Sequence, residues 1–120
     1  MVILDYKATS NKNEINYVNS KMSYHKSYLR QLDFYAYLLK LNKFKVFKTG
    51  YWVICNAQYQ EQKIFGGNLN FTIDLLPYNV KTDYIESTLI ELDKCFNNSK
   101  IPLPSTFCDA CRWQKETSKI

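Results

Sequence analysis

Apolar and polar positions along the first half of the chain predict a strand, a loop and a helix. The β-branched run Val2-Ile3-Leu4 predicts a strand over about residues 2–8. The polar stretch Thr9–Ser23 predicts a loop. Over 24–42, polar residues recur at steps of three, four and seven, which predicts a helix whose other faces are largely buried. The predicted polar stripe consists of Lys26, Arg30, Asp33 and Lys40.

The second half predicts two strands, a helix and a tail. Within Lys45–Ala57, the segment Tyr51–Cys55 is apolar at every position, which predicts a central strand covered on both faces. A half-buried strand is predicted from the alternation that Pro77 ends. Its apolar members are Leu69, Phe71, Ile73 and Leu75. The two strands occupy 45–76, a helix follows over 83–97, and a tail over 101–120 contains two prolines and a Cys-x-x-Cys.

This order of elements predicts an α/β (α+β) domain with a mixed sheet. A chain of 120 residues corresponds to one domain, and 46% hydrophobic content is typical of a globular protein. The longest wholly apolar run, Phe34–Leu39, is far shorter than a membrane span, and the N-terminus shows no signal-peptide pattern. We therefore expect a cytoplasmic protein with no membrane partner.

The basic residues are concentrated in the first half of the chain. Residues 1–60 contain nine Lys and Arg but three Asp and Glu, whereas residues 61–120 contain seven and eight. A basic surface that also carries many aromatic side chains suits a nucleic acid. The alternative is an ordinary solvated lysine face, and composition alone does not exclude it.

Asp5 and Lys7 are the first candidate site residues. Two residues apart on a strand, they point to one face with Cα atoms about 6.6 Å apart, while Leu4 and Tyr6 point to the other. Such a pair can hold a divalent cation and steady a water nucleophile or a phosphate charge. The alternative is an ordinary ion pair at a strand end.

Gln31 and Tyr35 form a second candidate pair. They are four residues apart and therefore share a helix face. The glutamine lies within an aromatic stripe, and its amide can both donate to and accept from a ligand. The alternative is a glutamine whose hydrogen bonds are satisfied inside the core.

Taken together, the strand "VILDYKAT" and the helix "RQLDFYAYLL" resemble the PD-(D/E)XK nuclease superfamily, in its RecB/AddB-like branch. The later strand "GYWVIC" and the tail "IPLPSTFCDAC" match the order of elements in that branch. The resemblance covers nearly the whole chain. It implies a restriction-endonuclease-like mixed sheet flanked by helices.

The resemblance also implies roles for individual residues. Asp5 would be a ligand of Mg²⁺ or Mn²⁺, with the Tyr6 backbone carbonyl as a second ligand. Lys7 would be the catalytic lysine. Gln31 and Tyr35 would position the nucleic-acid backbone and the active-site strand. From charge and position alone, we also expect Lys26 and Arg30 to contact phosphates.

One part of the family pattern is missing. The family uses a further metal-binding acid from a strand that precedes the Asp-x-Lys strand, and only four residues precede Asp5. The nearest downstream acid, Glu14, lies in the polar loop and matches no family motif. We therefore expect the C-terminal part of a nuclease domain, whose sheet another chain or a missing N-terminal segment would complete.

Cys108 and Cys111 resemble the C-terminal cysteines that hold an iron–sulfur cluster in some of these nucleases. A [4Fe–4S] cluster needs four thiolates, and no cysteine follows Cys111. A structural zinc site would also need two further ligands, and His25 is the only histidine. We interpret the pair as a cluster remnant or a packing turn and expect no bound cluster.

Two hypotheses about function follow from these residues. The first is a metal-dependent nuclease module that hydrolyses phosphodiester bonds of DNA, incomplete as this chain, in a process such as DNA repair. The alternative is a non-catalytic nucleic-acid-binding or interaction remnant of such a nuclease. Whether the chain is an enzyme depends on the missing carboxylate. A small metal-binding module built on the cysteines is a third hypothesis, which the shortage of ligands disfavours.

Overall fold

The computed structural model describes residues 1–11, 15–19, 21–58 and 66–118, and Glu14 lies outside the described residues. These residues form an α+β structure with a three-stranded mixed sheet and three helices. The chain divides into two compact units, Met1–Ile85 and Glu86–Ile120, which are described separately below.

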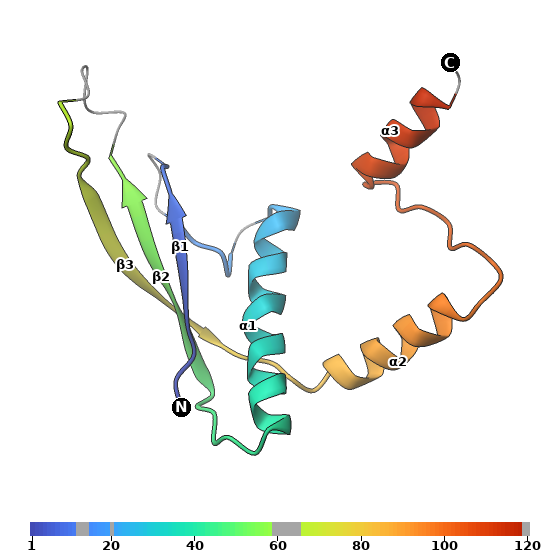
Figure 1. Ribbon diagram of the computed structural model, residues 1–120, viewed down its shortest axis with the longest axis horizontal. Helices are drawn as coiled ribbons and strands as arrows, with labels where there is room; N and C mark the ends of the chain where they lie inside the picture. The colour runs from blue at the N-terminus through green and yellow to red at the C-terminus, as the bar shows by residue number, and fades with distance from the viewer. Residues whose placement is uncertain (12–14, 20, 59–65, 119–120) are drawn as a thin grey trace. The chain divides into compact units, whose positions relative to one another are not determined.

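The sheet belongs to the first unit and has the strand order β1-β2-β3 (Figure 1). Its strands are β1 (Leu4–Thr9), β2 (Thr49–Ala57) and β3 (Phe71–Asn79). Strand β1 runs parallel to β2, and β3 runs antiparallel to it. The predicted mixed sheet and the central position of β2 are confirmed. Strand β3 was predicted to end at Pro77, but it continues through Pro77 to Asn79. An edge strand tolerates a residue that has no N–H donor.

Helix α1 (Ser23–Leu41) packs on one face of this sheet (Figure 1). Its Leu32 and Ala36 are completely buried in one core with Trp52 and Ile54 of β2. Gly50 allows this close approach, since a Cβ there would lie 2.6 Å from Leu32 Cδ2. The helix thus brings one of its faces directly against β1 and β2.

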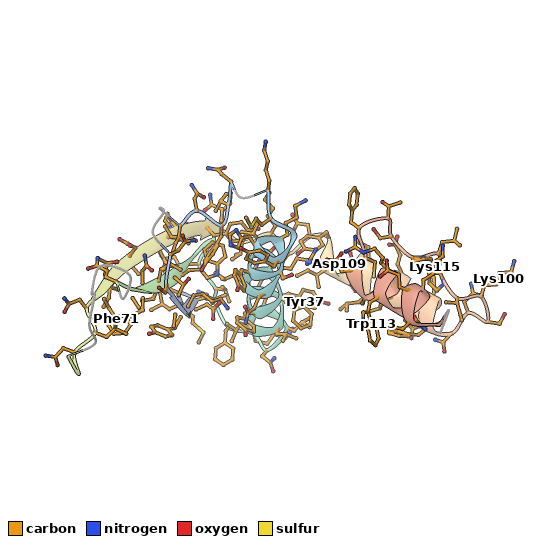
Figure 2. The ribbon with its side chains drawn as sticks, turned by 90° about the horizontal axis from the view of Figure 1, so that it is seen from above. Tyr37, Phe71, Lys100, Asp109, Trp113 and Lys115 are labelled. Carbon is orange, nitrogen blue, oxygen red and sulfur yellow. The ribbon has the colours of Figure 1, made fainter. Side chains whose placement is uncertain are left out.

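The opposite face of the sheet carries exposed apolar side chains. The register places Tyr6, Val53 and Leu75 in one row across this face. Ile73 and Leu75 are 70% and 61% exposed, and Phe71 projects into solvent at the sheet end (Figure 2). The prediction of a half-buried β3 with these residues inward is therefore wrong, as is cover on both faces of β2. Alternation identifies two faces of a strand but does not say whether a layer packs on each.

Asp33 of α1 is buried, so its place in a solvent-facing polar stripe was predicted wrongly. Its Oδ1 accepts a hydrogen bond from the Lys81 N–H at 2.7 Å. Its Oδ2 accepts from the hydroxyls of Tyr78 and Tyr84 at 3.2 and 3.0 Å. Burial and the neighbouring carboxylate raise the pKa of Tyr84 to about 12 and raise that of Tyr78 still further. Asp33 thus links α1 to the end of β3 and the segment after it.

Helix α1 ends in a Schellman motif. The N–H of Phe44 donates to the Leu39 carbonyl at 3.1 Å, and the N–H of Lys43 donates to the Lys40 carbonyl at 3.0 Å. Lys43 lies in the left-handed region with φ 66°, which glycine adopts more easily. This turn leads the chain into the segment before β2.

The remaining helices are α2 (Ile85–Phe96) and α3 (Asp109–Thr117). The predicted helix over 83–97 is confirmed as α2. Helix α3 lies in the segment 101–120, which was predicted only as a tail with a Cys-x-x-Cys, and Cys108 caps this nine-residue helix. Its Trp113 is 67% exposed (Figure 2). None of the helices in the described ranges is long and apolar enough to cross a membrane.

Candidate functional site

The candidate site lies between β1 and α1 in the first unit. Residues along β1 alternate between exposed and half-buried, with Asp5 and Lys7 on the half-buried side. Their side chains are 14% and 18% exposed. Leu4 and Tyr6 are more than 60% exposed on the other face. The predicted orientation of the strand is therefore confirmed, and it follows directly from the two-residue period of a strand.

Four predicted site residues are joined by one continuous set of contacts. Lys7 Nζ lies 2.9 Å from Asp5 Oδ2 and donates a hydrogen bond of 2.8 Å to Gln31 Oε1. Gln31 Nε2 in turn donates to Tyr35 Oη at 2.6 Å. The strand and the helix therefore bring Asp5, Lys7, Gln31 and Tyr35 together. The sequence spacing predicted the shared face within each pair, and the order of the motifs was the only signal that links the two pairs.

Tyr28 is a further member of this site that the sequence analysis did not single out. Its ring lies under the Lys7 ammonium, with 4.6 Å between Nζ and the ring centroid. A cation is attracted to the face of an aromatic ring at this distance. Tyr28 precedes Gln31 by three residues in the aromatic stripe, so the helical period was the available signal. The ring, the amide and the carboxylate together fix the position of the ammonium.

One oxygen of Asp5 has unused bonding capacity. Asp5 Oδ2 is buried and accepts no well-aligned hydrogen bond from the described residues, although the Lys7 ammonium is close to it. The ion pair with Lys7 at 2.9 Å compensates its charge, and a carboxylate oxygen has a second lone pair. A cation, or a donor on a bound ligand, would use that lone pair.

The Tyr6 carbonyl points to the free edge of the sheet. In the parallel ladder, the Ile3 carbonyl accepts from the Tyr51 N–H of β2 at 2.9 Å. Because alternate residues of a strand direct their backbone groups to the same side, Asp5 and Lys7 also bond toward β2. Leu4, Tyr6 and Ala8 then direct theirs outward, and β1 is an edge strand of the described sheet. The carbonyl expected to be a second metal ligand is thus available at that edge.

Asp5 and the Tyr6 carbonyl together offer a partial ligand set for Mg²⁺ or Mn²⁺. The described ranges contain no group of three or more His, Cys, Asp or Glu residues that could hold a metal ion. Mg²⁺ is usually bound through one or two carboxylates while it keeps several waters and takes substrate phosphate oxygens. The residues present therefore fit a weakly held Mg²⁺ that a substrate phosphate helps to coordinate.

Lys26 and Arg30 are exposed and lie on another side of α1. At 100° per residue, they are about 140° and 100° around the helix axis from Gln31. The Arg30 guanidinium donates to Ser27 Oγ at 3.3 Å. The structure does not gather these two residues with the other four, and their contact with phosphates stays a prediction.

Cys108 and Cys111 lie side by side at the start of α3 in the second unit. Their Sγ atoms are hydrogen-bonded at 2.9 Å, and the Cys111 N–H donates to Cys108 Sγ at 3.4 Å. The hydrogen bonds from the thiol and N–H of Cys111 lower the pKa of Cys108. The same thiol–thiol hydrogen bond raises the pKa of Cys111. Neither pKa shift bears on the expectation that the pair holds no iron–sulfur cluster, which stays untested.

Comparison of the chain with protein-family models, with curated proteins and with solved structures finds no match. The resemblance to PD-(D/E)XK nucleases therefore depends on the motif residues themselves. Their arrangement in the structure provides the physical basis for a proposal about function.

Proposed function

We propose that this chain is a metal-dependent nuclease module that hydrolyses phosphodiester bonds of DNA. The observation that carries the proposal is the contact chain from Asp5 through Lys7 and Gln31 to Tyr35. It combines a carboxylate, an ammonium and a partly buried amide on facing surfaces of β1 and α1. This is the combination of groups that a phosphodiester hydrolase needs around a scissile phosphate.

Each group has a chemical role in the proposal. Asp5 and the Tyr6 carbonyl would hold Mg²⁺ or Mn²⁺, which acts as a Lewis acid on a phosphate oxygen and favours ionisation of water. Lys7 stabilises the negative charge that develops on the phosphate, because its ammonium is already positioned by Gln31 and Tyr28. Tyr35 orients the Gln31 amide, so that its carbonyl oxygen faces Lys7. These two helix residues are positioning residues in this mechanism.

Asp5 and the Tyr6 carbonyl supply only part of the ligands of a metal ion, so a partner would supply the others. A further acidic ligand would come from another chain or segment whose strand pairs with the free edge of β1. An edge strand with unpaired backbone groups is a ready template for such pairing. DNA is then the substrate, and the second polypeptide segment is the structural partner.

A non-catalytic role is the second candidate. It is favoured by one observation, namely that no group of three or more metal-ligating residues is present in the described part of the chain. In this alternative, the same basic half binds nucleic acid without hydrolysing it. The two candidates differ in turnover and share DNA binding.

Cleavage of linear DNA in Mn²⁺ tests the first candidate. Lys7→Ala should reduce the cleavage rate about 10²- to 10³-fold, by analogy with loss of one preorganised charge-stabilising group. Lys48→Ala is the matched control, because Lys48 is an exposed lysine of the same unit outside the site. Equal rates for the wild type and Lys7→Ala would refute the assignment of the reaction to this site.

DNA binding in Ca²⁺ at several salt concentrations separates the two candidates. Affinity that falls steeply with salt, without any cleavage in Mn²⁺, would support the non-catalytic role. Salt-dependent binding with Lys7-dependent cleavage would support the nuclease. The absence of binding even at low ionic strength would refute both.

A further inference from the structure

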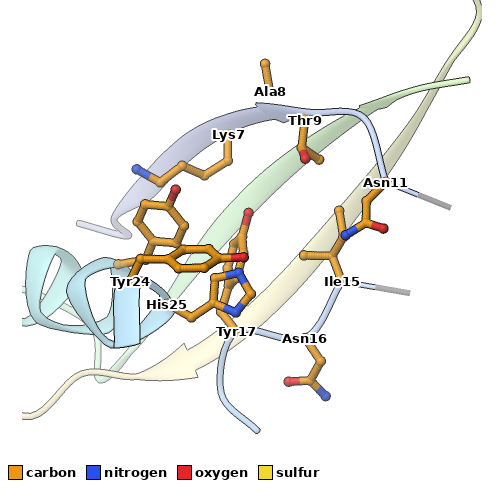
Figure 3. Close-up of a pocket in the computed structure, with 10 residues that line it drawn as sticks. Lys7, Ala8, Thr9, Asn11, Ile15, Asn16, Tyr17, Tyr24 and His25 are labelled. Carbon is orange, nitrogen blue, oxygen red and sulfur yellow. The ribbon is translucent and has the colours of Figure 1, made fainter. Parts of the chain in front are cut away.

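The thiols of Cys108 and Cys111 form a close pair in the second unit. Lys7 and the aromatic side chains around it, which Figure 3 shows, belong to the first unit. The two Sγ atoms lie 2.9 Å apart, and a disulfide joins its sulfur atoms at about 2.05 Å. A movement of about 1 Å would therefore bring the two sulfur atoms to bonding distance.

The first turn of α3 makes Cys108 the more nucleophilic member of the pair (Figure 1). Cys108 is the N-cap residue, and its Sγ accepts a hydrogen bond from the Cys111 N–H at 3.4 Å. The Cys111 thiol, together with the N–H groups of Cys111 and Ala110, lowers the pKa of Cys108. Since the thiolate is the attacking species in thiol–disulfide exchange, Cys108 is suited to the first step.

The neighbours of Cys108 leave it open to a small reagent. Phe107 is 92% exposed, and the Asp109 side chain, which projects from α3 in Figure 2, is 84% exposed. Asp109 places a negative charge next to the thiolate, but the Arg112 guanidinium lies 2.7 Å from its carboxylate. This ion pair reduces the repulsion between the carboxylate and the thiolate.

We infer that Cys108 and Cys111 are a redox-active dithiol, which a low-molecular-weight disulfide such as glutathione disulfide oxidises to an internal disulfide. The Cys108 thiol loses its proton to water, and the thiolate attacks one sulfur of glutathione disulfide, which releases one glutathione thiolate. Cys111 gives its proton to that thiolate and then attacks the Cys108 sulfur, which releases the second glutathione. This second thiolate takes a proton from water, so the pair loses two electrons and two protons while the oxidant becomes two thiols. The inference does not depend on the proposed nuclease activity.

A redox titration of the full chain, prepared under argon, tests this inference. The protein is equilibrated with mixtures of reduced glutathione and glutathione disulfide, quenched with acid, alkylated and digested with trypsin. Cleavage after Lys100 and Arg112 gives one peptide that contains both cysteines of the pair. We expect this peptide without alkyl groups and lighter by two hydrogen atoms, with an oxidised fraction that follows the ratio of glutathione disulfide to the square of reduced glutathione. A pair that is alkylated at every ratio, or that keeps a glutathione adduct, would overturn the inference.

Cys111→Ser separates the two steps of the reaction. The serine hydroxyl can still donate to Cys108 but cannot form the internal bond, so we expect glutathione to remain on Cys108 as a mixed disulfide. Cys95, an exposed cysteine of α2 in a different tryptic peptide, is the internal control. We expect Cys108 of this variant to acquire glutathione faster than Cys95. A rate equal to that of Cys95, or slower, would show that the first turn of α3 does not activate Cys108.

Discussion

Replacement of Asp33 by alanine should strongly destabilise the first unit. Asp33 is 2% exposed and accepts three hydrogen bonds from donors that follow it by 45 to 51 residues. Removal of the carboxylate leaves the Tyr78 hydroxyl and the Lys81 N–H without a partner. The Tyr84 hydroxyl can turn to water because Tyr84 is 38% exposed.

The magnitude follows from these donors. A buried donor that loses its partner costs about 1–3 kcal/mol, so the buried Tyr78 hydroxyl and the partly buried Lys81 N–H together cost about 2–4 kcal/mol. Relief of the desolvation penalty of the buried carboxylate offsets part of this loss. We expect the free energy of unfolding to fall by about 3 kcal/mol, within the range for loss of one partner in a buried polar network.

Urea unfolding followed by Trp52 fluorescence measures this change. Trp52 is completely buried, and its ring centroid lies 5.4 Å from that of Tyr78, so its emission reports on the cluster. A Trp113→Phe background removes the second tryptophan, which is exposed. Asp74→Ala, at an exposed acid of β3, is the control and should change the stability by less than about 0.5 kcal/mol. A loss below about 1 kcal/mol for Asp33→Ala would refute the assigned role.

The same cluster gives the unit a pH dependence. Burial of Tyr84 and its hydrogen bond to Asp33 raise the pKa of Tyr84 to about 12, above the usual value of 10.0. A folded-state pKa above the unfolded value favours the protonated phenol in the folded protein. The stability that the protonated Tyr84 contributes to the folded unit is therefore fully present below pH 10 and is lost as the pH rises through about 12. Trp52 emission recorded against pH should show unfolding in this alkaline range, and Asp33→Ala should lower the midpoint.

Three further substitutions or modifications test other features. Gly50→Ala should lower the free energy of unfolding in urea by about 1–3 kcal/mol, because the new Cβ would lie 2.6 Å from Leu32 Cδ2. Unchanged stability would disprove the close packing of α1 on β2. Lys43→Gly should raise the unfolding free energy by about 1 kcal/mol by relieving the φ of 66°, and a decrease would contradict the Schellman assignment. With limiting iodoacetamide at pH 7.5, peptide mapping should find Cys108 alkylated before Cys111, because the lowered pKa of Cys108 gives it more thiolate. The reverse order would refute the assigned hydrogen bonds between the two cysteines.

Local periodicity was sufficient to predict which residues share a face within each pair of the candidate site. Asp5 and Lys7 share a face because side chains on any strand alternate. Gln31 and Tyr35 share a face because four residues make about one helical turn. The contact between the pairs depended on α1 packing against β1, for which the motif order was the only signal in the sequence.

Non-local partners explain what the sequence did not predict. Asp33 fits a polar stripe by spacing, but its hydrogen-bond donors come from the far end of the unit. The apolar residues of β3 alternate correctly, yet periodicity cannot tell which sheet face a helix covers. The helical period places Tyr28 on the face of Gln31, but the contact of its ring with Lys7 joins α1 to β1, which no pattern within one element reveals.

The parallel pairing of β1 with β2 has a consequence for the order of folding. Lys7 pairs with Ile54, 47 positions later, whereas Ala57 pairs with Phe71 after only 14 positions. Closing the longer loop costs about 1 kcal/mol more in chain entropy, and α1 must pack within it. Strands β2 and β3 can therefore pair before β1 joins them. After dilution from denaturant, the ammonium–amide contact between Lys7 and Gln31 would be among the last to form, so DNA binding would recover later than most of the sheet.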